Sequence, residues 1–227
     1  MLITGTSRGI GRNLAEHYAD EGYMVVGCSR GPSKIDRPTY RHVRLDVTSE
    51  PDVLRLFGDI RKTHGRLDVL VNNAGAASMN HIGLTPLQTV QSLLNVNFVA
   101  SFLFCREAAK IMQRARFGRI VNFTTVAVPL SLTGEAAYAS SKAALETLTR
   151  IAAHEFAELG ITVNAVGPTP IKTDLVRSVP ETALKAVVDR QSIRRVAEFR
   201  DISNVVDFFI REESGFVTGQ VIYLGGV

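Results

Sequence analysis

Short apolar runs alternate with longer amphipathic stretches along the whole chain, and this alternation restricts the fold more than any single motif. The runs at 24–26, 67–71 and 119–123 have the length of strands, whereas 86–115 has the spacing of a long helix. Strands and helices in alternation are typical of a parallel sheet with helices on both faces. The sequence therefore predicts one α/β domain over residues 1–227, a doubly wound, Rossmann-type sheet of about seven strands.

The composition is that of an ordinary soluble domain, with 45% hydrophobic and 21% charged residues. The net charge is +4, and the basic residues are interspersed with acidic ones, which favours a solvated surface. A site for anionic substrates or for cofactor phosphates is the alternative. Basic and aromatic residues form no stripe, so we expect no nucleic-acid partner. We also expect no membrane association, because no apolar run reaches the ~18 residues of a membrane helix, and we predict no signal peptide. Two cysteines fit a reducing compartment, so we expect a cytoplasmic protein.

A glycine-rich turn, Thr4-Gly5-Thr6-Ser7-Arg8-Gly9-Ile10-Gly11, joins the first expected strand to the first expected helix. Gly5 can make the sharp turn, Gly9 lets the backbone approach a pyrophosphate, and Gly11 lets the helix pack against the strand. The N-terminus of the following helix offers free N–H groups to phosphate oxygens. We therefore predict a dinucleotide site at this turn, with further contacts from Ser7, Arg8 and Ile10.

The end of the second expected strand favours NADP(H) over NAD(H). An NAD site has an acid there that accepts from the ribose 2′-hydroxyl. Here the strand ends in Gly27-Cys28-Ser29-Arg30, and the next acid is Asp36. Arg30 and Arg8 can pair with a 2′-phosphate, with Ser29 beside them, although two surface arginines remain the alternative.

Tyr138 and Lys142 lie four residues apart in an expected helix, so both side chains project from one face. A phenol has a reference pKa of ~10, and a neighbouring cation favours its ionised form. The pair can therefore serve as a proton donor and acceptor whose pKa the lysine lowers. An exposed helix pair is the alternative when these two residues are considered alone.

Taken together, the motifs resemble the short-chain dehydrogenase/reductase family over essentially the whole chain. The group that includes the 3-oxoacyl-[acyl-carrier-protein] reductases is the most similar. In the family's order, the chain contains the glycine turn, Asp46-Val47, Asn72-Asn73-Ala74-Gly75, Asn97, Tyr138 with Lys142, and the segment from Pro168 to Thr173.

The resemblance implies a role for each of these positions. Asp46 and Val47 would hold the adenine, and the segment 72–75 would line the adenosine ribose and brace the sheet, with Asn73, Ala74 and Gly75 as cofactor contacts. Tyr138 would be the general acid when a carbonyl is reduced and the general base in reverse. Lys142 would lower the tyrosine pKa and bind the nicotinamide ribose. The family's helix asparagine, which holds a relay water, corresponds to Asn97, and the cofactor contacts near the nicotinamide would be Pro168, Ile171 and Thr173.

Two positions depart from the family pattern. The residue thirteen before the tyrosine, usually serine, is Thr125, which keeps the hydroxyl that would bind the substrate oxygen. Alternation along a strand directs its neighbour Thr124 to the opposite face. The usual Pro-Gly is replaced by Pro168-Thr169-Pro170, which predicts a loop of different shape beside the nicotinamide.

We therefore expect an enzyme that moves a hydride between NADP(H) and a carbonyl/secondary-alcohol pair, with a small-molecule carbonyl or an acyl thioester as substrate. Docking of an acyl carrier protein is in doubt, because only Arg116 of two basic positions is kept and the other is Leu159. A non-catalytic cofactor-binding subunit is the alternative. The five histidines lack metal-ligand spacing, so no metal is expected, and Met79 and His81 lie in a loop that could touch substrate.

The resemblance also implies a homodimer or homotetramer, and the segment 169–195 is expected to cover the substrate. Small residues in the two long helices would allow close helix contact between subunits, with packing onto the sheet as the alternative. These residues are Ala100, Ser101, Ala108, Ala109, Ala143, Ala144, Ala152 and Ala153.

Overall fold

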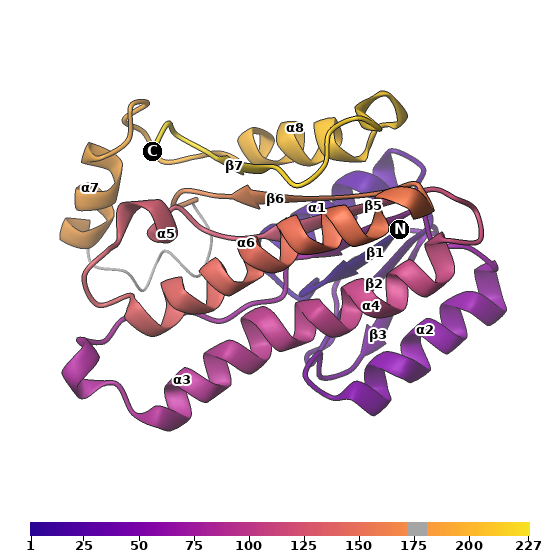
Figure 1. The fold of residues 1–227 in the computed structure, drawn as a ribbon, viewed down its shortest axis with the longest axis horizontal. Helices are drawn as coiled ribbons and strands as arrows, with labels where there is room; N and C mark the ends of the chain where they lie inside the picture. Colours follow the sequence, from indigo (N-terminus) through magenta and orange to yellow (C-terminus); the bar gives the residue numbers. More distant parts are fainter. Residues whose placement is uncertain (172–180) are drawn as a thin grey trace.

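A computed structural model describes residues 1–171 and 181–227, in which seven parallel strands form one sheet (Figure 1). The strand order is β3-β2-β1-β4-β5-β6-β7, which confirms the doubly wound fold. The chain first builds β1 to β3 outward in one direction and then returns beside β1 to build β4 to β7 in the other. The strands are β1 Leu2–Thr4, β2 Val25–Ser29, β3 Tyr40–Arg44, β4 Val69–Asn72, β5 Gly118–Phe123, β6 Ile161–Gly167 and β7 Val221–Tyr223.

Helices cover both faces of this sheet (Figure 1). On one face lie α2 (Glu50–His64), α4 (Ala100–Met112) and α6 (Ala136–Phe156), and on the other lie α1 (Gly9–Asp20) and α8 (Phe199–Ile210). Shorter elements complete the described part: η1 Ile82–Leu84, α3 Leu87–Leu94, α5 Ala127–Leu130, η3 Ala157–Leu159, α7 Glu181–Asp189 and η5 Glu212–Ser214.

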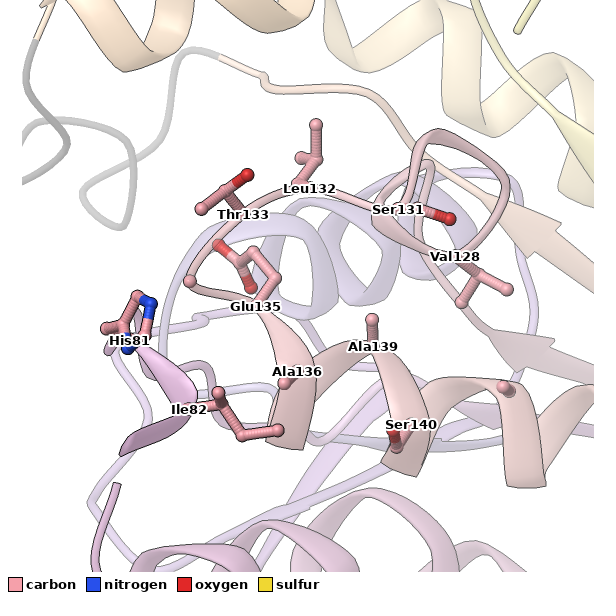
Figure 2. Close-up of a pocket in the computed structure, with 12 residues that line it drawn as sticks. His81, Ile82, Val128, Ser131, Leu132, Thr133, Glu135, Ala136, Ala139 and Ser140 are labelled. Atoms are coloured by element: carbon pink, nitrogen blue, oxygen red, sulfur yellow. The ribbon is translucent and has the colours of Figure 1, made fainter. Parts of the chain in front are cut away.

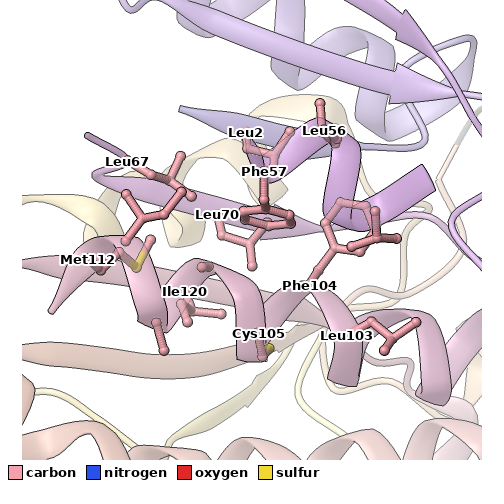
Figure 3. Packing of buried hydrophobic residues seen from close by; sticks show 14 of the residues in the cluster. Leu2, Leu56, Phe57, Leu67, Leu70, Leu103, Phe104, Cys105, Met112 and Ile120 are labelled. Carbon is pink, nitrogen blue, oxygen red and sulfur yellow. The ribbon is translucent and has the colours of Figure 1, made fainter. Parts of the chain in front are cut away.

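Each face of the sheet has its own apolar core. Figure 3 shows part of the first, where Phe57 of α2 meets Phe104 of α4 edge-on with ring centroids 5.5 Å apart. Leu70 and Ile120, from β4 and β5, are almost fully buried beside them. Burying such a side chain contributes roughly 1.5–3 kcal/mol, so the two cores hold the strand ends in fixed positions.

The long helix expected over 86–115 is interrupted. Between α3 and α4 the backbone forms a π-helical turn over Asn95–Val99, which inserts extra backbone and turns Asn97 into the interior. The continuous stretch Leu87–Met112 is long and apolar enough, by length and composition, to cross a membrane, although the sequence has no uninterrupted run of that length. A core helix passes the same test, and much of α4 is buried against α2 and the sheet.

The small residues of the two long helices mostly pack inside the subunit. Six of the eight are buried: Ala100, Ser101, Ala108, Ala109, Ala152 and Ala153. For these six the packing alternative is therefore correct, and only Ala143 and Ala144 remain partly exposed on α6.

The fold fixes where a ligand can bind. In doubly wound sheets, ligands lie beyond the carboxyl ends of the strands, where the strand order reverses. That point is the boundary between β1 and β4, so the turns after these two strands face the same crevice.

Candidate active site

The glycine turn after β1 has the geometry of a phosphate cradle. Gly5 and Gly9 have φ of +77° and +61°, which side chains rarely adopt. A Cβ at Gly11 would lie 2.5 Å from the Gly5 carbonyl oxygen, whereas a Cβ at Gly9 would meet nothing within 4 Å. Gly11 is therefore needed for packing, and the backbone at Gly9 is open to a ligand.

The N-terminus of α1 can bind an anion. No side chain caps it, and its first turn contains no acid, so its N–H groups and the positive end of the helix dipole are available. Ser7, Arg8 and Ile10 lie in the same turn, and each is at least partly exposed. The turn thus fits the pyrophosphate of a dinucleotide.

Thr4, which the sequence analysis did not single out, holds the glycine turn against the end of β4. Its hydroxyl accepts hydrogen bonds from the backbone N–H groups of Asn73 (3.0 Å) and Ala74 (2.9 Å). The side-chain amide of Asn73 donates in return to the backbone carbonyl of Thr4 at 2.9 Å. Asn72 instead points into the sheet and donates to Asn122 Oδ1 at 2.9 Å, which is the bracing role expected for the motif.

The turns after β1, β2 and β3 meet at the adenosine end of the crevice. A Cβ at Gly31, just past Arg30, would lie 3.9 Å from Ser7 Cβ, so the two turns lie close together. Asp46 accepts from the Thr48 N–H at 2.9 Å, and this bond lowers the pKa of the carboxyl, with a smaller contribution from the Arg30 charge. The structure therefore brings Arg30 near Asp46, with Val47 buried beneath.

Thr125, Tyr138 and Lys142 come together at the carboxyl end of β5. The Thr125 hydroxyl lies close enough to the Tyr138 phenol, in the first turn of α6, to lower the pKa of the phenol. The Lys142 ammonium, one helical turn further on, is buried and donates to the Phe123 carbonyl at 2.6 Å. The structure thus assembles the hydroxyl, phenol and ammonium predicted from the sequence.

The electrostatics of this group differ from the expectation. Burial raises the pKa of Tyr138 to about 12, and the hydrogen bond from Thr125 opposes this rise only in part. Burial also lowers the pKa of Lys142 to about 8. Lys142 is not among the groups that shift the pKa of Tyr138, and desolvation outweighs the contribution of Thr125, so the pKa is raised where a lowered value was expected. At neutral pH the phenol keeps its proton and can act as an acid.

Asn97 completes the group from the π-helical turn. Its amide oxygen accepts from the Ala76 N–H, and its amide nitrogen donates to the Ala76 carbonyl and to Ser141 Oγ, each at 2.9 Å. A Cβ at Gly75 would lie 3.0 Å from Asn97 Oδ1 and 3.3 Å from Lys142 Nζ. The bare backbone of Gly75 thus leaves room for these two side chains to meet.

Thr124 and Thr125, just past the end of β5, have different partners on α6. The Thr124 hydroxyl donates to the buried carboxylate of Glu146 at 2.6 Å, and the Tyr223 hydroxyl donates to the same oxygen at 2.7 Å. Thr124 is therefore engaged within the fold, and Thr125 is the hydroxyl presented to the site.

The loop after β6 borders the same site. Pro168 O accepts from the Val126 N–H at 3.3 Å, and Ile171 pairs with Ala197 in an isolated bridge. Thr169 is buried, and its hydroxyl has no hydrogen-bond partner among the described residues. Thr173 and the middle of the expected covering segment, 172–180, lie outside the described residues. The cofactor contact of Thr173 and the covering role of this segment therefore stay predictions.

A cleft of about 450 Å³ lies beside the first turns of α6 (Figure 2). His81 lines it, as does Glu135, whose charge raises the pKa of Tyr138 and whose own pKa is raised by burial. The sequence analysis missed Glu135, although its position three residues before Tyr138 places both on one helix face. The cleft offers a mainly apolar binding surface, bounded by Val128, Leu132, Ala136, Ala139 and Ala143 with Ser131, Thr133 and Ser140.

A glycine turn at the switch point of a parallel sheet, with a phenol, an ammonium and a hydroxyl in the same crevice, is typical of dinucleotide-dependent oxidoreductases. Comparison with known proteins agrees. A family profile described as enoyl-(acyl carrier protein) reductase matches residues 5–226. The chain belongs to the short-chain dehydrogenase/reductase family.

Individual relatives match over nearly their full lengths. A 3-oxoacyl-[acyl-carrier-protein] reductase of Staphylococcus epidermidis is 30% identical, with 99% of this chain and 96% of the relative covered. An uncharacterised oxidoreductase of Bacillus subtilis is 32% identical with the same coverage. The solved structure of ElxO with NADP bound superimposes with a TM-score of 0.91 at 30% identity, covering 98% of this chain and 95% of that one.

Proposed function

We propose that the protein is an NADP(H)-dependent oxidoreductase that moves a hydride between the nicotinamide and a carbonyl/secondary-alcohol pair. The observation that carries this proposal is the convergence of Thr125, Tyr138, Lys142 and Asn97 at the carboxyl end of the sheet. A site that only bound a dinucleotide would not require a protonated phenol beside a second hydroxyl.

The residues divide the chemistry between them. The cofactor, when bound, supplies or accepts the hydride. Tyr138 donates a proton to the carbonyl oxygen during reduction, and its high pKa keeps that proton in place at neutral pH. Thr125 donates a second hydrogen bond that orients the carbonyl and stabilises negative charge on its oxygen. Lys142 would hold the nicotinamide ribose, and Asn97 keeps Ser141 and the Ala76 backbone in position beside it.

Cofactor choice rests on charge at the end of β2. Ser29 stands where an NAD site has an acid, and Arg30 and Arg8 belong to turns that lie close together. Two guanidinium groups favour a 2′-phosphate by charge-assisted hydrogen bonds. We therefore expect NADP(H) to bind at least about tenfold better than NAD(H), a difference of ~1.4 kcal/mol.

A 3-oxoacyl thioester is the first substrate class to test, because similar reductases act on such substrates. The apolar walls of the cleft suit an acyl chain. Carrier-protein docking has weaker support, since Arg116 donates to the Glu158 carbonyl at 2.7 Å and Leu159 replaces the second basic residue. A free ketone therefore stands beside the thioester as a candidate.

The assembly we propose is a homodimer or homotetramer built on α4 and α6, in the cytoplasm. Exposed apolar side chains lie on adjoining helical segments: Val99 at the end of the π-helical turn, Phe102 of α4 and Ile151 of α6. Their burial would remove this apolar surface from water. Both cysteines are free and buried, which suits a reducing compartment.

The decisive assay follows the absorbance of NADPH and of NADH with a panel of ketones, 3-oxoacyl thioesters of pantetheine and of carrier protein, and an enoyl thioester. Oxidation of NADPH with a carbonyl substrate, and slower oxidation of NADH, is the expected result. Tight cofactor binding without turnover on any carbonyl would instead favour a non-catalytic subunit. Turnover confined to the enoyl thioester would reject carbonyl reduction.

A further inference from the structure

A cluster of polar side chains that the proposed chemistry does not use lies behind the adenosine end of the crevice. It joins Thr6 of the glycine turn, Ser29 at the end of β2, and Tyr40 and His42 of β3. At its centre is the backbone carbonyl of Gly31, which accepts from His42 Nε2 at 2.9 Å and from the Ser29 hydroxyl at 3.0 Å. The imidazole of His42 thus connects the glycine turn, the end of β2 and β3.

The hydrogen bonds fix the proton on the neutral imidazole. A carbonyl oxygen can only accept, so the His42 nitrogen facing Gly31 must be the one that carries hydrogen. The other nitrogen, Nδ1, then accepts from the Tyr40 hydroxyl at 2.9 Å. The Tyr40 oxygen also lies 2.9 Å from Thr6 Oγ1, so the connection continues to the glycine turn.

The cluster depends on space that other residues leave open. A Cβ at Gly27 would lie 2.3 Å from the Tyr40 hydroxyl and 2.6 Å from Thr6 Oγ1. Thr6 is fully buried and Ser29 nearly so, which makes unpartnered groups costly there. The cluster therefore holds the Ser29–Gly31 turn firmly, with Arg30 on its exposed side and Ser7 close to Gly31.

We propose that His42 is a positioning residue for the 2′-phosphate of NADP(H): it holds the Ser29–Gly31 turn so that Arg30 meets that phosphate. The inference rests on the proposed NADP(H) preference and adds a residue that would not itself contact the cofactor. Arg30 is exposed, so its direction depends on the backbone that carries it. Without the imidazole, the Gly31 carbonyl loses a donor and Tyr40 loses an acceptor, which frees the turn to move.

Loss of the His42 imidazole should affect only the binding of the 2′-phosphate. The residues proposed for the nicotinamide, Tyr138 and Lys142, lie at the other end of the crevice on α6. Loss of the imidazole should therefore weaken ligands that carry a 2′-phosphate and spare those that lack it. A purely structural role in folding would weaken both kinds of ligand.

The test compares binding of 2′,5′-ADP and 5′-AMP, which differ only by the 2′-phosphate, by calorimetry with the full-length protein. His42→Leu removes both hydrogen bonds, and His42→Gln keeps a donor that can reach the Gly31 carbonyl. His64→Leu, at the exposed end of α2, is the matched control, and thermal unfolding checks that each variant is folded.

We expect His42→Leu to weaken 2′,5′-ADP by about tenfold, or ~1.4 kcal/mol, while 5′-AMP changes by less than about twofold. His42→Gln should recover most of the loss, and His64→Leu should match the wild type. Equal weakening of both nucleotides, or no change in either, overturns the role of His42 and leaves the NADP(H) preference intact. A wild type that binds both nucleotides equally rejects the preference itself, and His42's role with it.

Discussion

The hydroxyl of Thr125 can be tested by two substitutions that separate its chemistry from its packing. Thr125→Ala removes the donor that orients the carbonyl, and loss of one such donor typically lowers turnover by about 10²–10³-fold. Thr125→Ser keeps the hydroxyl and loses only a methyl group, so turnover should stay within about threefold of the wild type. The alanine variant also deprives the Ala127 N–H of its acceptor, which lies at 3.2 Å, so about 1 kcal/mol of stability should be lost.

Steady-state kinetics with saturating NADPH measure the effect on turnover, and thermal unfolding measures the stability loss separately. Thr124→Ala is the matched control, because its hydroxyl serves Glu146 within the fold and should affect stability more than turnover. If Thr125→Ala turns over the substrate as fast as the wild type, Thr125 does not orient the carbonyl, and another group must do so.

Three further results are expected. Lys142→Met should lower both turnover and NADP(H) affinity by about tenfold or more, because one ammonium serves both tasks. Steady-state kinetics measure the turnover, and direct titration measures the affinity. An unchanged affinity would contradict the contact between Lys142 and the ribose. Because the pKa of Lys142 is lowered to about 8, the ammonium is charged below that pH and neutral above it. NADP(H) affinity should therefore fall as the pH rises through about 8, and Lys142→Met should abolish this step; an identical step in the variant would assign it elsewhere. Phe102→Glu places a charge on the exposed face of α4 and should reduce the mass found by light scattering to that of a monomer, whereas an unchanged mass would locate the interface on another surface.

The joint order of several motifs, more than any one of them, made the positions of the glycine turn and the tyrosine–lysine pair predictable. The turn lies between a strand and a helix as expected, and residues four apart on a helix share a face whatever the rest of the chain does. The alternation of strands and helices likewise predicted the doubly wound sheet that the structure shows. Strand boundaries differ by only a few residues, for example at β4, which is expected over 67–71 and found at Val69–Asn72.

Features that depend on distant contacts could not be predicted in this way. The segment of the π-helical turn, Asn95–Val99, contains neither glycine nor proline to mark an interruption, so the sequence shows one helix. The direction of the Tyr138 pKa shift depends on how deeply the tyrosine is buried, which spacing does not reveal. The cluster around His42 joins residues up to 36 positions apart, and only the folded sheet brings them together.

The central claim is that Tyr138 is the proton donor of a carbonyl reductase. Tyr138→Phe keeps the ring and removes only the hydroxyl, with Tyr23→Phe, an exposed tyrosine far along the chain from this site, as the matched control. Turnover of the carbonyl substrate and the dissociation constant of NADPH should be measured on the same preparations. The account predicts that Tyr138→Phe loses about 10²-fold or more in turnover while NADPH binding and the Tyr23 variant stay unchanged. Full turnover in Tyr138→Phe would contradict it.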